Sequence, residues 1–107
     1  MNSKKLKSEY LTFLTKYNSL HLATIGKNGR PESSYAPFVT DQKNNFYVFV
    51  STLSGHTSNM MEDGRAGIML IESEQEAENI FARKRVSFEC KVELVKKLDS
   101  DWSEIML

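Results

Sequence analysis

The chain has 107 residues, and its 14 lysine and arginine residues balance 14 aspartate and glutamate residues. A chain of this length forms one domain, and its balanced charge excludes a protein whose whole surface attracts nucleic acid or an anionic membrane. Because the only cysteine, Cys90, cannot form an internal disulfide and no apolar stretch is long enough to span a bilayer, we expect a soluble protein of a reducing compartment, the cytoplasm.

The first part of the chain predicts a helix followed by a hairpin. Apolar residues recur at spacings of three and four over residues 6–17, which is the pattern of an amphipathic helix. Residues 19–25 then have strand character and run toward Asn28 and Gly29, a pair that can adopt the two positive φ angles of a type I′ turn. We therefore expect residues 19–25 to pair with residues 30–39.

Two prolines restrict the second strand of this hairpin. Since neither Pro31 nor Pro37 can donate to a ladder, we expect an edge strand or a strand with irregular ends. Residues 41–45 predict another turn. They lead into residues 46–50, whose aromatic and β-branched side chains without polar interruption are typical of a strand buried on both faces.

Strand character returns at residues 65–72. The acidic stretch 72–79 is expected to be a loop or a short solvent-facing helix. Apolar and polar residues then alternate over residues 86–95, which predicts one long strand with a core face and a wet face. Cys90 falls on the core face, so we interpret it as a small core residue.

The end of the sequence predicts a helical turn. Residues 99–106 would form it, with Asp99 or Ser100 as its cap. Together the elements amount to five or six antiparallel strands joined by tight turns, with a helix at the front. This arrangement indicates a small barrel or a sheet with appended helices.

The segment of residues 51–64 has two interpretations. In the structural one, Ser54 or Thr57 caps a short helix whose Met60 and Met61 pack inward. In the functional one, the helix N-terminus and the hydroxyl groups beside it bind a phosphate or a carboxylate. The two are compatible, and the residues alone leave both open.

The two histidines are weak evidence for a metal site. His56, within this segment, can donate to an anion or ligate a metal, but no second histidine stands at ligand spacing. His21, inside an alternating strand, is expected to be a half-buried structural residue. We therefore predict no metal site.

A second candidate cluster is Arg83, Lys84 and Arg85 at the start of a strand. Three successive cations usually form a solvated rim. Strand residues alternate faces, however, so Arg83 and Arg85 share one side, where two guanidinium groups can hold carboxylates or phosphates in bidentate fashion. A third candidate is the polar strand at residues 31–37, with Tyr35 in its middle. In the structural alternative, Tyr35 is a core residue and Ser33 or Ser34 faces water.

No nucleophile elbow, P-loop, paired metal-ligand motif or glycine-rich dinucleotide fingerprint is present in the sequence. Nothing therefore supports a hydrolase or a nucleoside-triphosphate enzyme.

Three segments, LATIGKNGRPESSYAPFV, FYVFVSTLSGHTSNMMEDGRAGIMLIE and ARKRVSFECKVEL, follow one another within about residues 19–95. Their order and spacing resemble the split-barrel flavin-binding superfamily of pyridoxamine 5′-phosphate oxidase, and more closely its haem-utilisation (HugZ/HutZ-type) branch. The resemblance implies a mainly β (α+β) fold, a six-stranded antiparallel split β-barrel with short helices. It also implies a two-fold homodimer with cofactor sites in the clefts between its subunits.

The resemblance further implies which residues bind the cofactor. A strand end falls where oxidase relatives hold the flavin phosphate, a polar strand lines the same cleft, and a basic motif reaches toward haem in the haem branch. The strand end that would hold the phosphate contains Ser51, Thr52, Gly55, His56, Thr57 and Asn59. The polar strand contains Ser33, Ser34 and Tyr35, and the basic motif contains Arg83 and Arg85.

The sequence departs from both branches. Oxidase relatives place Arg and Lys on the phosphate, where this chain has Ser and His, so FMN binding would be weaker or absent. Haem-branch relatives supply an axial histidine from a C-terminal segment, and this sequence ends at Leu107 before such a segment. We expect residues 1–107 to form one split-barrel domain, and it stays open whether a C-terminal segment of the family is missing from it.

Three functions therefore stay open for a homodimer with a small-molecule cofactor and no nucleic-acid or membrane partner. The first is haem binding at the dimer cleft, with haem degradation and iron release. The second is an FMN-dependent oxidoreductase. The third is a non-catalytic split-barrel dimer that has lost its cofactor.

Overall fold

The computed structural model describes residues 3–98 and 101–107. The helices are α1 (Ser3–Lys16) and α2 (Gly55–Asp63), and the strands are β1 (Ser19–Ile25), β2 (Pro31–Thr40), β3 (Phe46–Ser51), β4 (Arg65–Ile71), β5 (Arg85–Lys91), β6 (Glu93–Lys97) and β7 (Trp102–Met106). Two single-turn 3-10 helices, η1 (Lys27–Gly29) and η2 (Ile80–Ala82), lie between strands.

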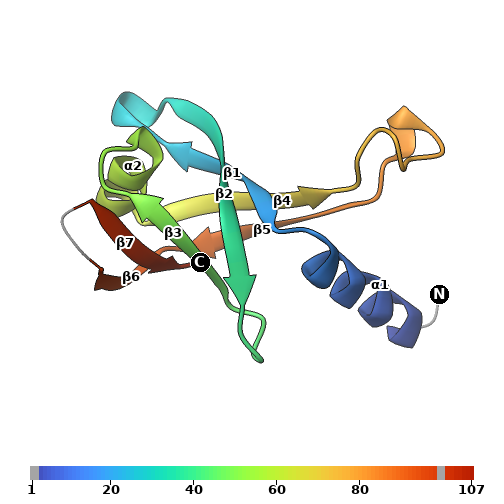
Figure 1. Cartoon of the computed structure of the whole chain (residues 1–107). Helices are drawn as coiled ribbons and strands as arrows, with labels where there is room; N and C mark the ends of the chain where they lie inside the picture. Colours follow the sequence, from blue (N-terminus) through green and yellow to red (C-terminus); the bar gives the residue numbers. More distant parts are fainter. Residues whose placement is uncertain (1–2, 99–100) are drawn as a thin grey trace.

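The strands form one antiparallel sheet in the order β5-β4-β1-β2-β3-β7-β6. The sheet curls on itself, with α2 at one end and α1 projecting from the other (Figure 1). The predicted mainly β split-barrel architecture is confirmed, with seven strands in place of six. Among the described residues, no helix is long and apolar enough to cross a bilayer.

The β1–β2 hairpin forms as its turn residues predict. Asn28 and Gly29 have φ angles of 62° and 73°, and the Gly26 N–H donates to the Arg30 carbonyl at 2.7 Å. Strand β2 is not an edge strand, because it pairs with both β1 and β3. Pro31 and Pro37 stand at the two ends of the β1 ladder, so neither proline removes a bond from the middle of the sheet.

The described residues bury one face of the curled sheet and leave the other exposed. Strand β3 shows this clearly, since Val48 is fully buried whereas Phe49 is 43% exposed. The prediction that residues 46–50 are buried on both faces is therefore wrong. The core consists of Leu14, Leu20, Leu22, Ala36, Phe38, Phe46, Val48, Val50, Met60, Ala66, Ile68, Leu70 and Ile105.

The expected long strand at residues 86–95 divides at Val92. The Val92 N–H donates to the Gly64 carbonyl at 2.9 Å, after which the chain leaves β4 and pairs with β7 as β6. The alternation of burial stops there, because Leu94 is exposed. Cys90, before the break, packs against the core as predicted, and burial raises the pKa of its thiol.

The predicted C-terminal helical turn is wrong. Residues 102–106 form strand β7, in which the fully buried Ile105 lies opposite Val48 of β3. The proposed caps Asp99 and Ser100 lie outside the described residues. The spacing of Trp102 and Ile105 suited one helical turn equally well, and pairing with β3 decided for a strand.

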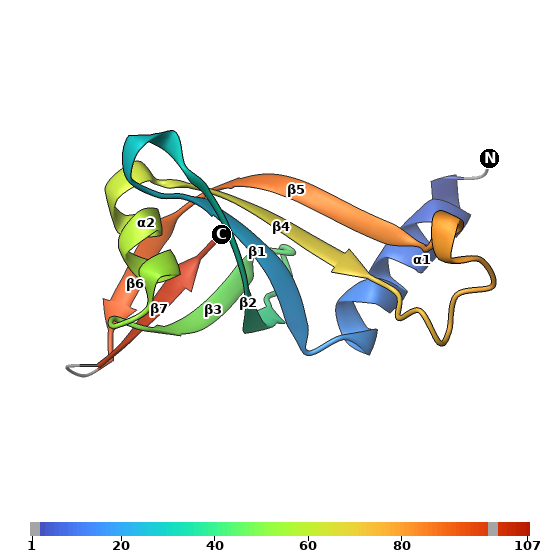
Figure 2. The ribbon, with the colours of Figure 1, turned by 90° about the horizontal axis from the view of Figure 1, so that it is seen from above.

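The molecule is elongated along the β4–β5 ribbon (Figure 2). Its principal extents are 44, 30 and 22 Å, and its radius of gyration is 14.9 Å, against about 13 Å for a compact chain of this length. Helix α1 packs on β5 through an edge-to-face contact of Tyr10 with Phe88, whose ring centroids are 5.9 Å apart. The ribbon thus separates an α2 end from an end formed by α1 and η2.

Candidate functional site

Helix α2 begins where the barrel is split. Strand β2 pairs with β1 up to Pro37 and with β3 only from Phe38 onward, so the first part of β2 and the last part of β3 diverge. The first turn of α2 bridges them. His56 contacts β2 through Ser34, and Thr57 is bonded to the end of β3.

Two hydroxyl groups at this split, those of Ser51 and Thr57, form hydrogen bonds within the chain. Ser51 Oγ accepts the Leu53 N–H at 3.2 Å, and the buried Thr57 hydroxyl donates to the Ser51 carbonyl at 2.6 Å. Ser54 stands at the N-cap position, but its side chain makes no capping bond, so neither Ser54 nor Thr57 caps the helix in the expected way. The structural interpretation of this segment accounts for most of its composition.

The remainder of α2 is also structural. Gly64 ends the helix in the left-handed conformation with a φ of 80°. Met60 is buried as predicted, whereas Met61 is exposed, which corrects the expectation that both methionines pack inward. Asn59 Nδ2 donates to Thr24 Oγ1 at 3.0 Å and to Glu32 Oε2, so Asn59 joins α2 to the β1–β2 hairpin and is not aimed at a ligand.

His56 and Ser34 are brought together from distant parts of the sequence. His56 Nδ1 lies 3.0 Å from Ser34 Oγ, and Ser34 Oγ donates to the Leu22 carbonyl at 3.4 Å. A hydroxyl has one proton, so Ser34 accepts from Nδ1–H and the lone pair of the neutral imidazole is on Nε2. Partial burial lowers the pKa of His56 below its ordinary value of 6.5, which favours this neutral form.

The outer face of the sheet across β2, β1, β4 and β5 is open. Directly paired residues point to the same face, and the register places Tyr35, His21, Met69 and Ser87 in one row. Tyr35 is 70% exposed. His21 is exposed as well, which corrects its interpretation as half-buried.

Small residues hollow this face. The next row contains Ser33, Ala23 and Gly67, and a shallow depression of about 580 Å³ lies over them and their neighbours. A Cβ added to Gly67 would meet the Cβ of Ala23 at 3.6 Å. Another surface can therefore approach the backbone of the sheet closely here.

Arg83 and Arg85 lie at the opposite end of the β4–β5 ribbon. Arg85, the first residue of β5, is paired with Ile71 and exposed. Arg83 Nε donates to the Glu72 carbonyl at 2.9 Å, while its two terminal nitrogens make no hydrogen bond to the described residues. This anchoring through Nε leaves the outer edge of the guanidinium group free for an anion.

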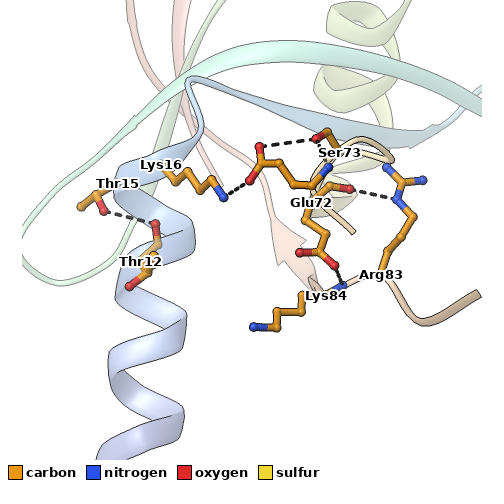
Figure 3. A network of polar contacts seen from close by, with 8 residues as sticks. Thr12, Thr15, Lys16, Glu72, Ser73, Arg83 and Lys84 are labelled. Carbon is orange, nitrogen blue, oxygen red and sulfur yellow. Dashed lines mark hydrogen bonds and ion pairs between the residues drawn. The ribbon is translucent and has the colours of Figure 1, made fainter. Parts of the chain in front are cut away.

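The segment that carries Arg83 is tied to the rest of the protein (Figure 3). The Glu72 carboxylate accepts the Lys84 N–H at 2.9 Å, and the Glu72 N–H donates to the Lys84 carbonyl at 2.9 Å. The Glu76 carboxylate forms an ion pair with Lys16 of α1 and accepts from Ser73 Oγ at 3.4 Å. The sequence analysis missed Glu72 and Glu76, whose roles follow only from the pairing of an acidic stretch with a basic one.

The structure brings some of the predicted site residues together and keeps others apart. The split at α2 gathers Ser34, His56 and the 51–59 segment, and Ser33 and Tyr35 lie on the outer face beside it. Arg83 and Arg85 are separated from this group by the length of β4, about 20 Å at the usual rise of a strand. One chain therefore does not assemble the whole predicted site.

The family model described as pyridoxamine 5′-phosphate oxidase matches residues 6–105. The chain belongs to this family. It is 35% identical over 102 residues to a protein of Vibrio cholerae serotype O1 named heme oxygenase HutZ, covering 95% of this chain and 57% of that protein. The chain thus spans somewhat more than half the length of this relative.

Solved structures share the fold. HutZ from Vibrio cholerae, described as a haem storage protein, superposes with a TM-score of 0.85 at 29% identity, covering 94% of this chain and 87% of that one. ChuZ from Campylobacter jejuni gives a TM-score of 0.87 at 24% identity, covering 98% of this chain and 53% of that one. The predicted relation to haem-utilisation proteins of this family is confirmed.

Proposed function

We propose that this protein binds haem as a homodimer, in clefts that each subunit completes for the other. The observation that supports this most directly is the separation of Arg83 and Arg85 from the α2 split, which lie at opposite ends of the sheet. In such a dimer, the outer sheet faces of two subunits lie against each other, and the two-fold axis lies between these faces, perpendicular to the strands. It brings the arginine end of each subunit to the α2 end of its partner.

The outer face suits such an association. Its central residues Ala23, Ser33 and Gly67 are small, which allows close approach, and the exposed Tyr35 stands beside them. An exposed sheet face with a large aromatic side chain beside a shallow hollow is typical of an interaction surface. The pairing is self-complementary, as a two-fold interface requires.

The donor groups fit haem better than FMN. Two guanidinium groups suit the two propionates of haem, since each can bind a carboxylate in bidentate fashion. At the α2 split, by contrast, residues 51–63 contain no arginine or lysine, and the Ser51 and Thr57 hydroxyls are already bonded within the chain. A phosphomonoester would find few free donors there.

The chain's own residues would hold and orient the group. Arg83 and Arg85 would bind its carboxylates, and Ser34 holds His56 with the Nε2 lone pair unused by the described residues. Bound haem would supply redox-active iron. By relation to HutZ we extend the proposal to haem degradation with release of iron, in the cytoplasm.

Absorption titration with haem tests the proposal. The expected result is a shifted Soret band with saturation at a fixed ratio to a dimer, whose mass is measured by light scattering. Arg85→Ala should weaken haem binding. The control Lys84→Ala removes the same charge from a side chain in the groove beside α1 and should leave haem binding unchanged. A wild-type protein that leaves the haem spectrum unchanged, or one that is monomeric with haem bound, would refute the proposal.

A further inference from the structure

The single turn η2 presents two large apolar side chains to solvent. Phe81 is 92% exposed and Ile80 is 61% exposed. One exposed apolar residue is ordinary on a protein surface. Two adjacent ones at the tip of a projecting loop, one of them an almost completely exposed phenylalanine, indicate a surface that another group covers.

The turn is held in shape before anything binds to it. Asn79 Oδ1 accepts the Phe81 N–H at 2.9 Å, and the Asn79 carbonyl accepts the Ala82 N–H at 2.9 Å. The Glu72 carboxylate closes the base of the loop by accepting the Lys84 N–H, and Glu76 joins the loop to Lys16 of α1. A group that binds Phe81 therefore loses little affinity to the ordering of this loop.

The charge beside the turn indicates what the group is. Arg83 and Arg85 follow Phe81 within four positions, and the terminal nitrogens of Arg83 are unused by the described residues. Apolar area next to guanidinium groups complements a flat apolar ring system with carboxylates on its edge. An FMN molecule has a phosphate and a polar ribityl chain, which match this surface less well.

We propose that Phe81, supported by Ile80, is a specificity-determining residue that packs against the macrocycle of a carboxylate-bearing tetrapyrrole in the cleft completed by the partner subunit. The inference rests on the proposed function and adds the source of its selectivity. The arginines bind the carboxylates, and the apolar turn distinguishes a porphyrin from a flavin.

Three variants test this inference in the dimeric protein. Phe81→Ser removes the apolar ring, Phe81→Leu keeps most of its apolar area, and Ile80→Ser tests the neighbouring side chain. Each is titrated with haem, with metal-free protoporphyrin IX by fluorescence, and with FMN. Because both side chains are exposed, melting temperature and dimer mass should be unchanged.

We expect Phe81→Ser to weaken haem and protoporphyrin binding by about 10- to 100-fold, the loss expected for one buried phenylalanine side chain. Phe81→Leu should stay within about threefold of wild type, and any FMN affinity should be unaffected. Equal loss for metal-free protoporphyrin and haem would place the contact on the ring and not on the iron.

Other outcomes overturn the inference. Unchanged protoporphyrin affinity in Phe81→Ser would show that the turn does not touch the ring, and an equal loss of FMN affinity would remove its role in specificity. Dissociation of the dimer would show that the turn packs instead on protein, and the exposed Leu53, which precedes α2, would be the apolar partner to test. Wild-type protein that binds neither tetrapyrrole would refute the proposed function itself and the inference with it.

Discussion

Replacing Phe88 by alanine should uncouple α1 from the barrel. Phe88 is partly buried against the core, and its ring lies 5.9 Å from that of Tyr10 in α1 and 6.0 Å from that of Phe46 in β3. Removing a fully buried phenylalanine costs about 3–5 kcal/mol, and each aromatic pair accounts for about 0.5–1.5 kcal/mol. Because Phe88 is only partly buried, we expect a loss of about 2–4 kcal/mol.

Urea unfolding at one fixed protein concentration measures this loss, since any dimer makes stability depend on concentration. The matched control is Phe81→Ala, which removes the same ring from an exposed position and should change stability by about 0.5 kcal/mol or less. A cycle with Tyr10→Ala isolates the contact between α1 and β5. Equal effects of the Phe81 and Phe88 substitutions, or no coupling between Tyr10 and Phe88, would refute this account of how α1 is held.

Three further predictions follow from the polar contacts. Asp41 accepts hydrogen bonds from the Asn45 N–H and the Tyr47 hydroxyl, which lower its pKa from 3.8 to about 2. The ionised carboxylate therefore stabilises the fold above pH 3.8, and this stabilisation is lost as the pH falls toward 2. Over this pH range, the urea midpoint of Asp41→Ala should fall less steeply than that of the wild type. Burial lowers the pKa of His56, so as the pH falls below 6.5 this histidine is protonated in the unfolded chain before it is protonated in the folded one. The melting temperature should therefore decrease less below pH 6.5 in His56→Gln than in wild type. Glu72→Ala should weaken haem binding by about fivefold, the effect of one lost hydrogen bond, because the loop that carries Arg83 loses the bond from the Lys84 N–H to the Glu72 carboxylate. Glu72→Gln keeps an acceptor and should restore binding. Equal weakening by both variants would contradict this positioning role.

Features that depend on a few neighbouring residues could be predicted from the sequence. The turn at Asn28 and Gly29 follows from their tolerance of positive φ angles. The strands at 19–25 and 65–71 follow from their apolar and branched residues between turn signals. The order of three segments was sufficient for the family, because each segment combines several such local features at a defined spacing.

Features that depend on which distant segment a strand pairs with could not be predicted from the sequence. The break at Val92 occurs because the chain changes its pairing from β4 to β7, although the apolar alternation continues through it. The last segment is a strand because Ile105 pairs opposite Val48. Phe49 is exposed because none of the described residues forms a second layer over this face of β3, which an apolar sequence by itself does not reveal.

For the candidate site, the sequence by itself determined the chemistry: a hydroxyl-rich strand end with one imidazole, and two guanidinium groups two positions apart. The expectation that both arginines lie on one strand is wrong, because β5 begins at Arg85 and Arg83 precedes it. Only the tertiary structure decided what these groups are free to do. It committed Thr57 and Asn59 to internal bonds, joined His56 to Ser34, and placed the arginines a strand's length away from both. The physical reason is that residue type fixes which bonds a side chain can make, whereas the register of the sheet fixes which partners lie within reach.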